Sequence, residues 1–185
     1  MDTLRLLGFA GSLRKASFNR QLLSLCDSLL PQNTQMNLIE LNDIPLYNAD
    51  VETQGFPNSV KTLKENITQA QGILIASTEY NYSVSGVLKN ALDWISRPPN
   101  EIPLEKKPCA IISASSSRFG GARSQQHLRQ ILSALGAYVM PQPELYIPQA
   151  QKVFIESEPI DEKSKTRIQS FLKAFTEFVQ LIQYH

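Results

Sequence analysis

Residues 4–19 read LRLLGFAGSLRKASFN, and a strand, a loop and the start of a helix follow one another within them. The apolar run Leu4–Ala10 has the length and composition of a buried strand. Apolar residues recur at helical spacing from Phe18 onward, as far as Pro31. A strand that passes through a short loop into a helix is typical of an α/β domain with parallel strands.

The loop between this strand and this helix has the donors that a phosphate needs. Exposed N–H groups at a helix N-terminus attract anions, and Arg14 adds a planar fork of charged donors. Side-chain donors are supplied by Ser12, Ser17 and Asn19. The loop lacks the G-x-x-x-x-G-K-[ST] and G-x-G-x-x-G spacings, so it is neither a nucleotide P-loop nor a dinucleotide fingerprint. The same serines could instead only cap the helix, and the sequence leaves both interpretations open.

Composition predicts an ordinary globular protein, with residues 1–185 forming one domain. Hydrophobic residues make up 42% and the net charge is +1, which gives no general attraction to nucleic acid or to a membrane. The sequence shows no secretory signal and no apolar run of membrane-spanning length, so we expect a cytoplasmic protein. Cys26 and Cys109 form no metal-ligand pattern, and we expect both to be buried without a metal.

The rest of the chain alternates between apolar runs and helical periodicity. Further strands are predicted at 36–41, 72–77, 109–114 and 137–140, and further helices at 60–70, 87–95, 128–135 and 167–182. The second strand is the most polar, which is typical of a sheet edge. This pattern predicts a five-stranded parallel sheet of order 2-1-3-4-5, with helices on both faces and a ligand at the carboxyl ends of the strands.

Two further polar loops follow strands of this sheet. Residues 77–86 read STEYNYSVSG, in which tyrosines beside an amide and a carboxylate can frame a flat heteroaromatic ring. Glu79 is a candidate acid or base, or alternatively a carboxylate that caps a helix or braces the loop. Residues 115–121 are rich in serine and glycine, so backbone N–H groups can approach a ligand closely, although a flexible turn would read similarly.

The segments GSLRKASFN, TEYNYSVSGVLKNALDW and SASSSRFGGAR, in this order and spacing, resemble the NAD(P)H-dependent FMN reductase family. This family is flavodoxin-like, with three layers, and includes soluble quinone and chromate reductases. The resemblance implies that the FMN phosphate is held by Ser12, Arg14, Ser17 and Asn19. It places Glu79, Tyr80 and Asn81 along the ribityl chain and ring, with Ser115 on the other side. We also expect cofactor contacts from Phe18, Thr78 and Gly121; the family usually has proline at position 78, and often at 85.

The implied activity is ping-pong transfer of hydride from NADPH or NADH to bound FMN, and then to a quinone, a free flavin or another small oxidant. Flavin chemistry occurs at N5, so we expect no catalytic side chain, and neither His127 nor His185 has a triad-like setting. Candidates for the substrate rim are Tyr82, Ser83 and Arg118. The resemblance further implies a homodimer or homotetramer. Arg123 and Glu144 match charged positions where related proteins make tetramer contacts, whereas Gln126 replaces an aromatic residue found in some relatives.

Two alternatives belong to other classes of protein. A flavodoxin-type electron carrier would bind FMN without oxidising NAD(P)H, but such carriers usually have an acidic surface, which a net charge of +1 does not favour. A flavin-free thiol phosphatase would need a C-x₅-R turn after the first strand, and neither cysteine lies in one.

Overall fold

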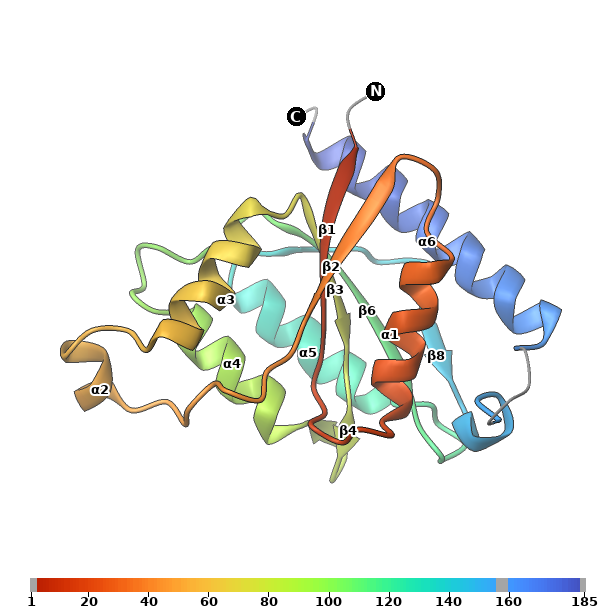
Figure 1. The fold of residues 1–185 in the computed structure, drawn as a ribbon, viewed down its shortest axis with the longest axis horizontal. Helices are drawn as coiled ribbons and strands as arrows, with labels where there is room; N and C mark the ends of the chain where they lie inside the picture. Colours follow the sequence, from red (N-terminus) through yellow and green to blue (C-terminus); the bar gives the residue numbers. More distant parts are fainter. Residues whose placement is uncertain (1–2, 156–159, 184–185) are drawn as a thin grey trace.

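The sheet lies between two layers of helices (Figure 1) in the computed structural model, which describes residues 3–155 and 160–183. His185 therefore lies outside the described residues. The strands of the sheet are β1 (Leu4–Ala10), β2 (Thr34–Ile39), β3 (Gly72–Ala76), β6 (Pro108–Ala114), β7 (Tyr138–Val139) and β8 (Leu145–Ile147). They pair in the order β2-β1-β3-β6-β7, and every pairing is parallel. The predicted order 2-1-3-4-5 and the parallel sheet are confirmed.

The fifth position of the sheet differs from the prediction because two short strands share it. Pro108 and Cys109 at the start of β6 pair with β7, whereas Ile112–Ala114 at its end pair with β8. Pro141 and Pro143 lie between β7 and β8, and proline has no N–H to donate to a sheet. One continuous strand cannot run through this segment, so the described residues form a six-stranded sheet rather than a five-stranded one.

The helices divide between the two faces of the sheet. Two of them, α1 (Phe18–Ser28) and α6 (Glu162–Gln183), pack on one face, and α3 (Asn58–Gln69), α4 (Gly86–Ile95) and α5 (Ala122–Ala134) pack on the other. Alternate residues of β1 point into opposite cores, with Leu6 toward α1 and α6 and Leu7 toward α3 and α4. This alternation explains why the central strands are apolar throughout, as predicted for a sheet covered on both faces.

Several short elements lie in segments that were expected to be loops. They are the helix α2 (Ala49–Thr53), the hairpin strands β4 (Glu79–Tyr80) and β5 (Ser83–Val84), and the 3₁₀ turn η1 (Ala150–Lys152). Elements of two to five residues are too short to show a hydrophobic period, so periodicity could not find them.

The two cysteines belong to the interior, as expected, and so does Trp94. Cys26 and Cys109 are free and fully buried, and burial raises the pKa of each thiol to about 12, so both are protonated at neutral pH. Trp94 is also buried, and its Nε1 donates a hydrogen bond to the Pro45 carbonyl at 2.8 Å. Within residues 3–155 and 160–183, no helix combines the length and apolar character that crossing a membrane requires.

Candidate functional site

The three polar loops meet at the carboxyl edge of the sheet and enclose a cleft of about 130 Å³. It is lined by Ser12, Arg14, Ser17, Phe18, Asn19, Thr78, Glu79, Tyr80, Ala114, Ser115 and Ser116. The residues expected to contact a cofactor line this cleft, except for Asn81 and Gly121. Ala114 and Ser116 also line it and were missed, because their side chains carry no signal that separates them from neighbouring loop residues.

The start of α1 presents donors that the protein does not use itself. Ser17 is the N-cap residue of α1 and only 4% exposed, yet its side chain makes no capping hydrogen bond. Ser12 is 5% exposed, and its Oγ accepts only a long hydrogen bond of 3.4 Å from the Arg14 N–H. The Arg14 side chain is exposed and has no ion-pair partner among the described residues. The structure therefore does not support the interpretation in which the Ser17 side chain caps α1.

Asn19 joins α1 to the end of β6. Its Oδ1 accepts a hydrogen bond from the Ala114 N–H, and its Nδ2 donates one to the Ala114 carbonyl, both at 2.9 Å. The side chain is 3% exposed. One of its two amide protons is used in this pair, so Asn19 retains a single N–H for a ligand. The pair also fixes the distance between the start of α1 and the end of β6.

A tight hairpin carries the aromatic side chains of the second loop. Asn81 and Tyr82, between β4 and β5, have φ values of 50° and 67°, as expected for a two-residue type I′ turn. Tyr80 lines the cleft and is 49% exposed, whereas Tyr82, 66% exposed, lies in the turn of the hairpin. A positive φ is unusual for tyrosine, and the two-residue turn requires it here.

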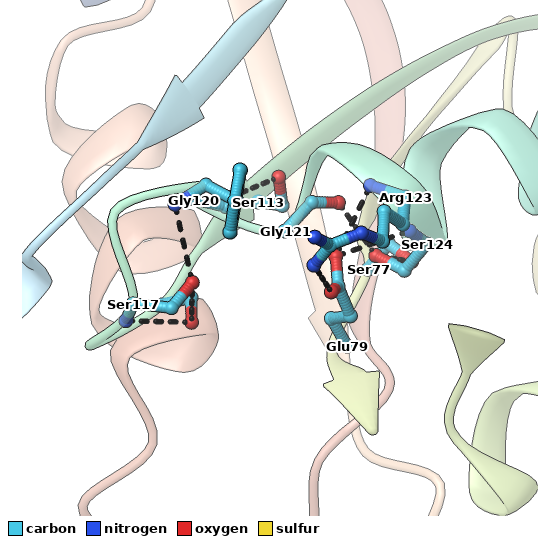
Figure 2. A network of polar contacts seen from close by, with 10 residues as sticks. Ser77, Glu79, Ser113, Ser117, Gly120, Gly121, Arg123 and Ser124 are labelled. Carbon is cyan, nitrogen blue, oxygen red and sulfur yellow. Dashed lines mark hydrogen bonds and ion pairs between the residues drawn. The ribbon is translucent and has the colours of Figure 1, made fainter. Parts of the chain in front are cut away.

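Glu79 braces the start of α5 instead of facing the cleft as a free carboxylate (Figure 2). Its Oε2 accepts hydrogen bonds from the N–H groups of Arg123 and Ser124 at 3.1 and 3.3 Å. Its Oε1 lies 3.2 Å from Nη1 of Arg123. The N-cap residue, Gly121, has no side chain, and Glu79 supplies the missing acceptor. Of the two roles considered for Glu79, this geometry matches the bracing carboxylate.

Arg123 links the hairpin to the third loop. Its guanidinium lies 4.0 Å from the centre of the Tyr82 ring and 4.1 Å from the centre of the Phe119 ring. The Ser83 hydroxyl lies 3.0 Å from Nδ1 of His127, which ties the hairpin to α5 a second time. The guanidinium of Arg118 lies 5.2 Å from the centre of the Phe119 ring. These cation–π contacts hold the rim in place.

The third loop is bound to the protein along its length. Ser115 donates its N–H to Ile147 at 3.1 Å and accepts from the Ala150 N–H at 2.9 Å. Within the loop, Oγ of Ser115 accepts from the Ser117 N–H, and Oγ of Ser117 accepts from the Phe119 N–H (Figure 2). Three of the loop's N–H groups are therefore already engaged. These bonds give the segment a defined conformation in the structure.

Gly121 is required by close packing as well as by its backbone conformation. Its φ is +88°, and an added Cβ would lie 2.7 Å from Cβ of Ser113. Beside it, the Ser113 hydroxyl donates to the Gly120 carbonyl at 2.7 Å, and Gln125 donates to the Ser113 Oγ at the same distance. Gly121 thus shapes the wall of the site without lining the cleft itself.

Ser85 is a supporting residue whose role was not predicted. It is 1% exposed, and its Oγ caps α4 by accepting from the Leu88 N–H at 3.2 Å. The same hydroxyl donates to the Gly11 carbonyl at 2.6 Å and so fixes the first loop. A serine directly before a helical apolar pattern is a recognisable N-cap signal, but its bond to Gly11 has no signature in the sequence.

Residues 4–152 match the family model described as NADPH-dependent FMN reductase. The chain belongs to this family. It is 43% identical over 183 residues to an NAD(P)H-dependent FMN reductase of Pseudomonas aeruginosa, and the match covers 98% of each chain. It is also 44% identical over 186 residues to a quinone reductase of Escherichia coli K12, again with 98% of each chain covered.

Among solved structures, the chain is similar to FerB, the flavoenzyme NAD(P)H:(acceptor) oxidoreductase from Paracoccus denitrificans. The TM-score is 0.88 and the identity 32%, with 96% of this chain and 97% of that chain covered. Family membership confirms the predicted resemblance, the flavodoxin-like fold, the oxidoreductase class and the dependence on FMN and NAD(P)H.

The donors, charge and aromatic surface of the residues at the cleft match the chemistry of FMN. A phosphate dianion needs several donors and a compensating charge, and the uncapped start of α1 with the free Ser17 hydroxyl and Arg14 offers both. Tyr80 and the hairpin at the mouth supply flat apolar surface beside polar backbone, which suits the edge and face of a flavin ring.

Proposed function

We propose that this protein transfers hydride from NADPH or NADH to FMN held in the cleft, and then passes the electrons to a quinone, a free flavin or another small oxidant. The observation that carries the proposal is the open start of α1, where a nearly buried N-cap serine makes no capping bond. Nearby, Arg14 has no ion-pair partner in the part of the chain that the structure describes. The family of the chain supports the same chemistry.

The first loop is proposed to bind the phosphate. Ser12, Ser17 and the first N–H groups of α1 would donate to its oxygens, and Arg14 would add charge-assisted hydrogen bonds. Phe18 contributes apolar surface beside them, and Asn19 offers its remaining N–H. These residues hold the cofactor and take no part in the chemistry.

The other two loops are proposed to hold the ring and receive the substrates. Thr78, Glu79, Tyr80 and Asn81 would line the ribityl chain and one side of the ring, with Ser115 on the other side and Gly121 as the shaping residue. Since the N–H groups of Ser115, Ser117 and Phe119 are engaged by the chain, we assign Ser116 as the backbone donor toward the ring. Tyr82, Ser83 and Arg118 would form the substrate rim.

Bound FMN supplies the redox chemistry, because its ring accepts a hydride and returns the electrons to a second substrate. The protein must therefore orient two flat substrates in turn over one ring face, for which ping-pong kinetics are expected. Glu79 is committed to α5, so we propose no side-chain acid or base for the hydride step. The quinone reductase name of the Escherichia coli relative supports a quinone as the acceptor.

The first test is the visible absorption of the purified protein, supplemented with FMN where the cofactor is lost on purification. Stopped-flow mixing with NADPH and, separately, with NADH should bleach the flavin absorbance rapidly, and adding a quinone should restore it. Double-reciprocal plots of the initial rate against NADPH concentration, at several fixed quinone concentrations, should give parallel lines if the order is ping-pong. A protein that binds FMN but is not reduced by either nicotinamide would be a flavodoxin-type carrier, and the proposal would fail.

We also propose a homodimer or homotetramer. The positions implied in tetramer contacts already have partners within the chain: Glu144 lies 3.6 Å from Nη2 of Arg129 and 3.5 Å from Nε2 of Gln126, while Arg123 binds Glu79. An interface there would have to share or replace these contacts. Light scattering coupled to size-exclusion chromatography measures the assembly, and a monomeric mass at micromolar concentration would contradict the proposal.

A further inference from the structure

Thr78 has a buried hydroxyl that the folded chain does not use. The residue is 7% exposed, and its Oγ1 has almost no exposed surface and no hydrogen-bond partner within residues 3–155 and 160–183. An unsatisfied buried hydroxyl carries an unfavourable free energy of about 1–3 kcal/mol, so proteins rarely retain one without a use for it. The unpaired hydroxyl of Thr78 therefore indicates a function outside the folding of the chain.

The neighbours of Thr78 make its isolation clearer. Ser77, directly before it, donates its hydroxyl to Oγ of Ser124 at 3.1 Å, and Glu79, directly after it, is held by α5. The other buried side-chain atoms without a partner among the described residues are Nε of Arg97, Oε1 of Gln125 and Nε of Arg129. None of those three residues lines the cleft, whereas Thr78 does.

The position of Thr78 in the sheet indicates which part of a flavin it can meet. Thr78 follows β3, which pairs with β1 on one side and β6 on the other. It therefore lies between the first loop, which offers the phosphate donors, and the third loop. In bound FMN, the ribityl chain lies between the phosphate and the ring, so it is the part of the cofactor that Thr78 can contact. Its hydroxyls both donate and accept hydrogen bonds, as a threonine hydroxyl does.

We propose that Thr78 is a cofactor-positioning residue whose hydroxyl forms a hydrogen bond with the ribityl part of bound FMN. Because Oγ1 has almost no exposed surface, the bond requires rotation about χ1, which moves the hydroxyl between staggered positions. The ligand then satisfies a group that the free protein leaves unpaired, and part of the cost of burying it is recovered on binding. This inference depends on the proposed function, since it assumes that FMN occupies the cleft.

Thr78→Val tests the proposal, because valine keeps the shape of threonine and removes only the hydroxyl. The unfolding temperature of the FMN-free variant should equal or exceed that of the parent protein, since an unsatisfied buried polar group has been removed. The Kd for FMN, measured by quenching of flavin fluorescence, should rise about 2- to 10-fold, as expected for loss of one neutral hydrogen bond. A purely structural threonine would instead lower the unfolding temperature.

Thr78→Ser retains the hydroxyl and should bind FMN with an affinity close to that of the parent. Thr176→Val is a matched control on α6: Thr176 is 6% exposed, but its hydroxyl already donates to the Lys173 carbonyl at 2.9 Å. That variant should leave the Kd for FMN unchanged.

Riboflavin, which lacks the phosphate, separates this inference from the phosphate site. The loss of affinity in Thr78→Val should persist with riboflavin, whereas the effect of Arg14→Ala should largely disappear. An unchanged Kd for FMN in Thr78→Val, or an effect confined to FMN, would overturn the assignment. A parent protein that does not bind FMN at all would instead overturn the proposed function.

Discussion

The helix α1 begins at the cleft and α5 begins beside it, and in both the N-cap residue makes no side-chain cap, yet their starts differ. At α5 the protein supplies the acceptor itself, because Glu79 reaches across from the hairpin to the N–H groups of Arg123 and Ser124. At α1, the side chain of the N-cap residue Ser17 makes no capping hydrogen bond within the described residues. One helix start is thus committed to the fold and the other keeps its donors for a ligand.

The start of α4 shows that the type of residue does not decide this difference. Ser85 and Ser17 are both nearly buried N-cap serines, but only Ser85 caps its helix. Ser85 differs in that its hydroxyl also donates to the Gly11 carbonyl, which fixes it beside the Leu88 N–H. A helix start with unused donors beside an unpaired arginine is therefore a better indicator of anion binding than the presence of a serine.

Gly121→Ala should disturb the committed helix start most severely. Its Cβ would lie 2.7 Å from Ser113 in a left-handed conformation, so we expect a loss of about 2–4 kcal/mol in the free energy of unfolding. Gly55→Ala is the control, since Gly55 also has a positive φ of 112° but nothing within 4 Å of an added Cβ. Urea denaturation of both variants separates crowding from backbone strain. Equal losses would show that the packing at Gly121 is not tight.

Arg14→Ala, at the open start of α1, should weaken FMN binding and leave stability unchanged. The side chain is exposed and unpaired among the described residues, so the unfolding free energy should hardly change. FMN binding should weaken by about 1.5–3 kcal/mol, because charge-assisted hydrogen bonds to the phosphate are lost. Fluorescence titration measures the Kd, with Lys15→Ala as a neighbouring control for general charge. If the two variants weaken binding equally, Arg14 has no specific role.

Glu79→Gln should destabilise the protein by about 1–2 kcal/mol, because the start of α5 loses a charged acceptor and Arg123 loses its ion pair. The amide oxygen of glutamine can still accept one N–H, so the protein should fold. Thermal unfolding measures the loss of stability, and FMN titration of the same sample measures any change in cofactor affinity. A variant of unchanged stability with strongly impaired FMN reduction would point to chemistry at Glu79 instead of bracing.

The pair Ser85→Ala and Ser17→Ala gives the smallest effects and the most direct test of the comparison. Ser85→Ala removes a cap and leaves the Gly11 carbonyl unpaired, so we expect a loss of about 1 kcal/mol in stability. Ser17→Ala should change stability by less than about 0.5 kcal/mol but weaken FMN binding by about 0.5–1.5 kcal/mol. Similar stability losses in both variants would mean that the two helix starts are equivalent.

The sequence predicted the order of the sheet and the three loops because these depend on hydrophobic patterns spread over many residues. Apolar runs such as Leu4–Ala10 mark central strands wherever they occur. The hairpin at Glu79–Val84 was missed because strands of two residues have no period, and the split fifth strand because the segment after Pro143 was not recognised as a second pairing site.

Within the site, the sequence identified donors but not their partners. It could not separate Ser17 from Ser85, or a free Glu79 from a committed one, because those differences depend on contacts such as the one between Glu79 and Arg123, 44 residues apart. The unpaired hydroxyl of Thr78 is a property of the same kind, visible only once its surroundings are known.

The reciprocal hydrogen bonds between Asn19 and Ala114 have a kinetic consequence. They fasten the start of α1 to the end of β6, so the gap between these two elements has its width before any cofactor arrives. A slot of preset width needs no opening motion to be filled. We therefore expect FMN capture to be a single-step encounter whose observed rate rises linearly with FMN concentration, without the plateau that a slow conformational step would impose.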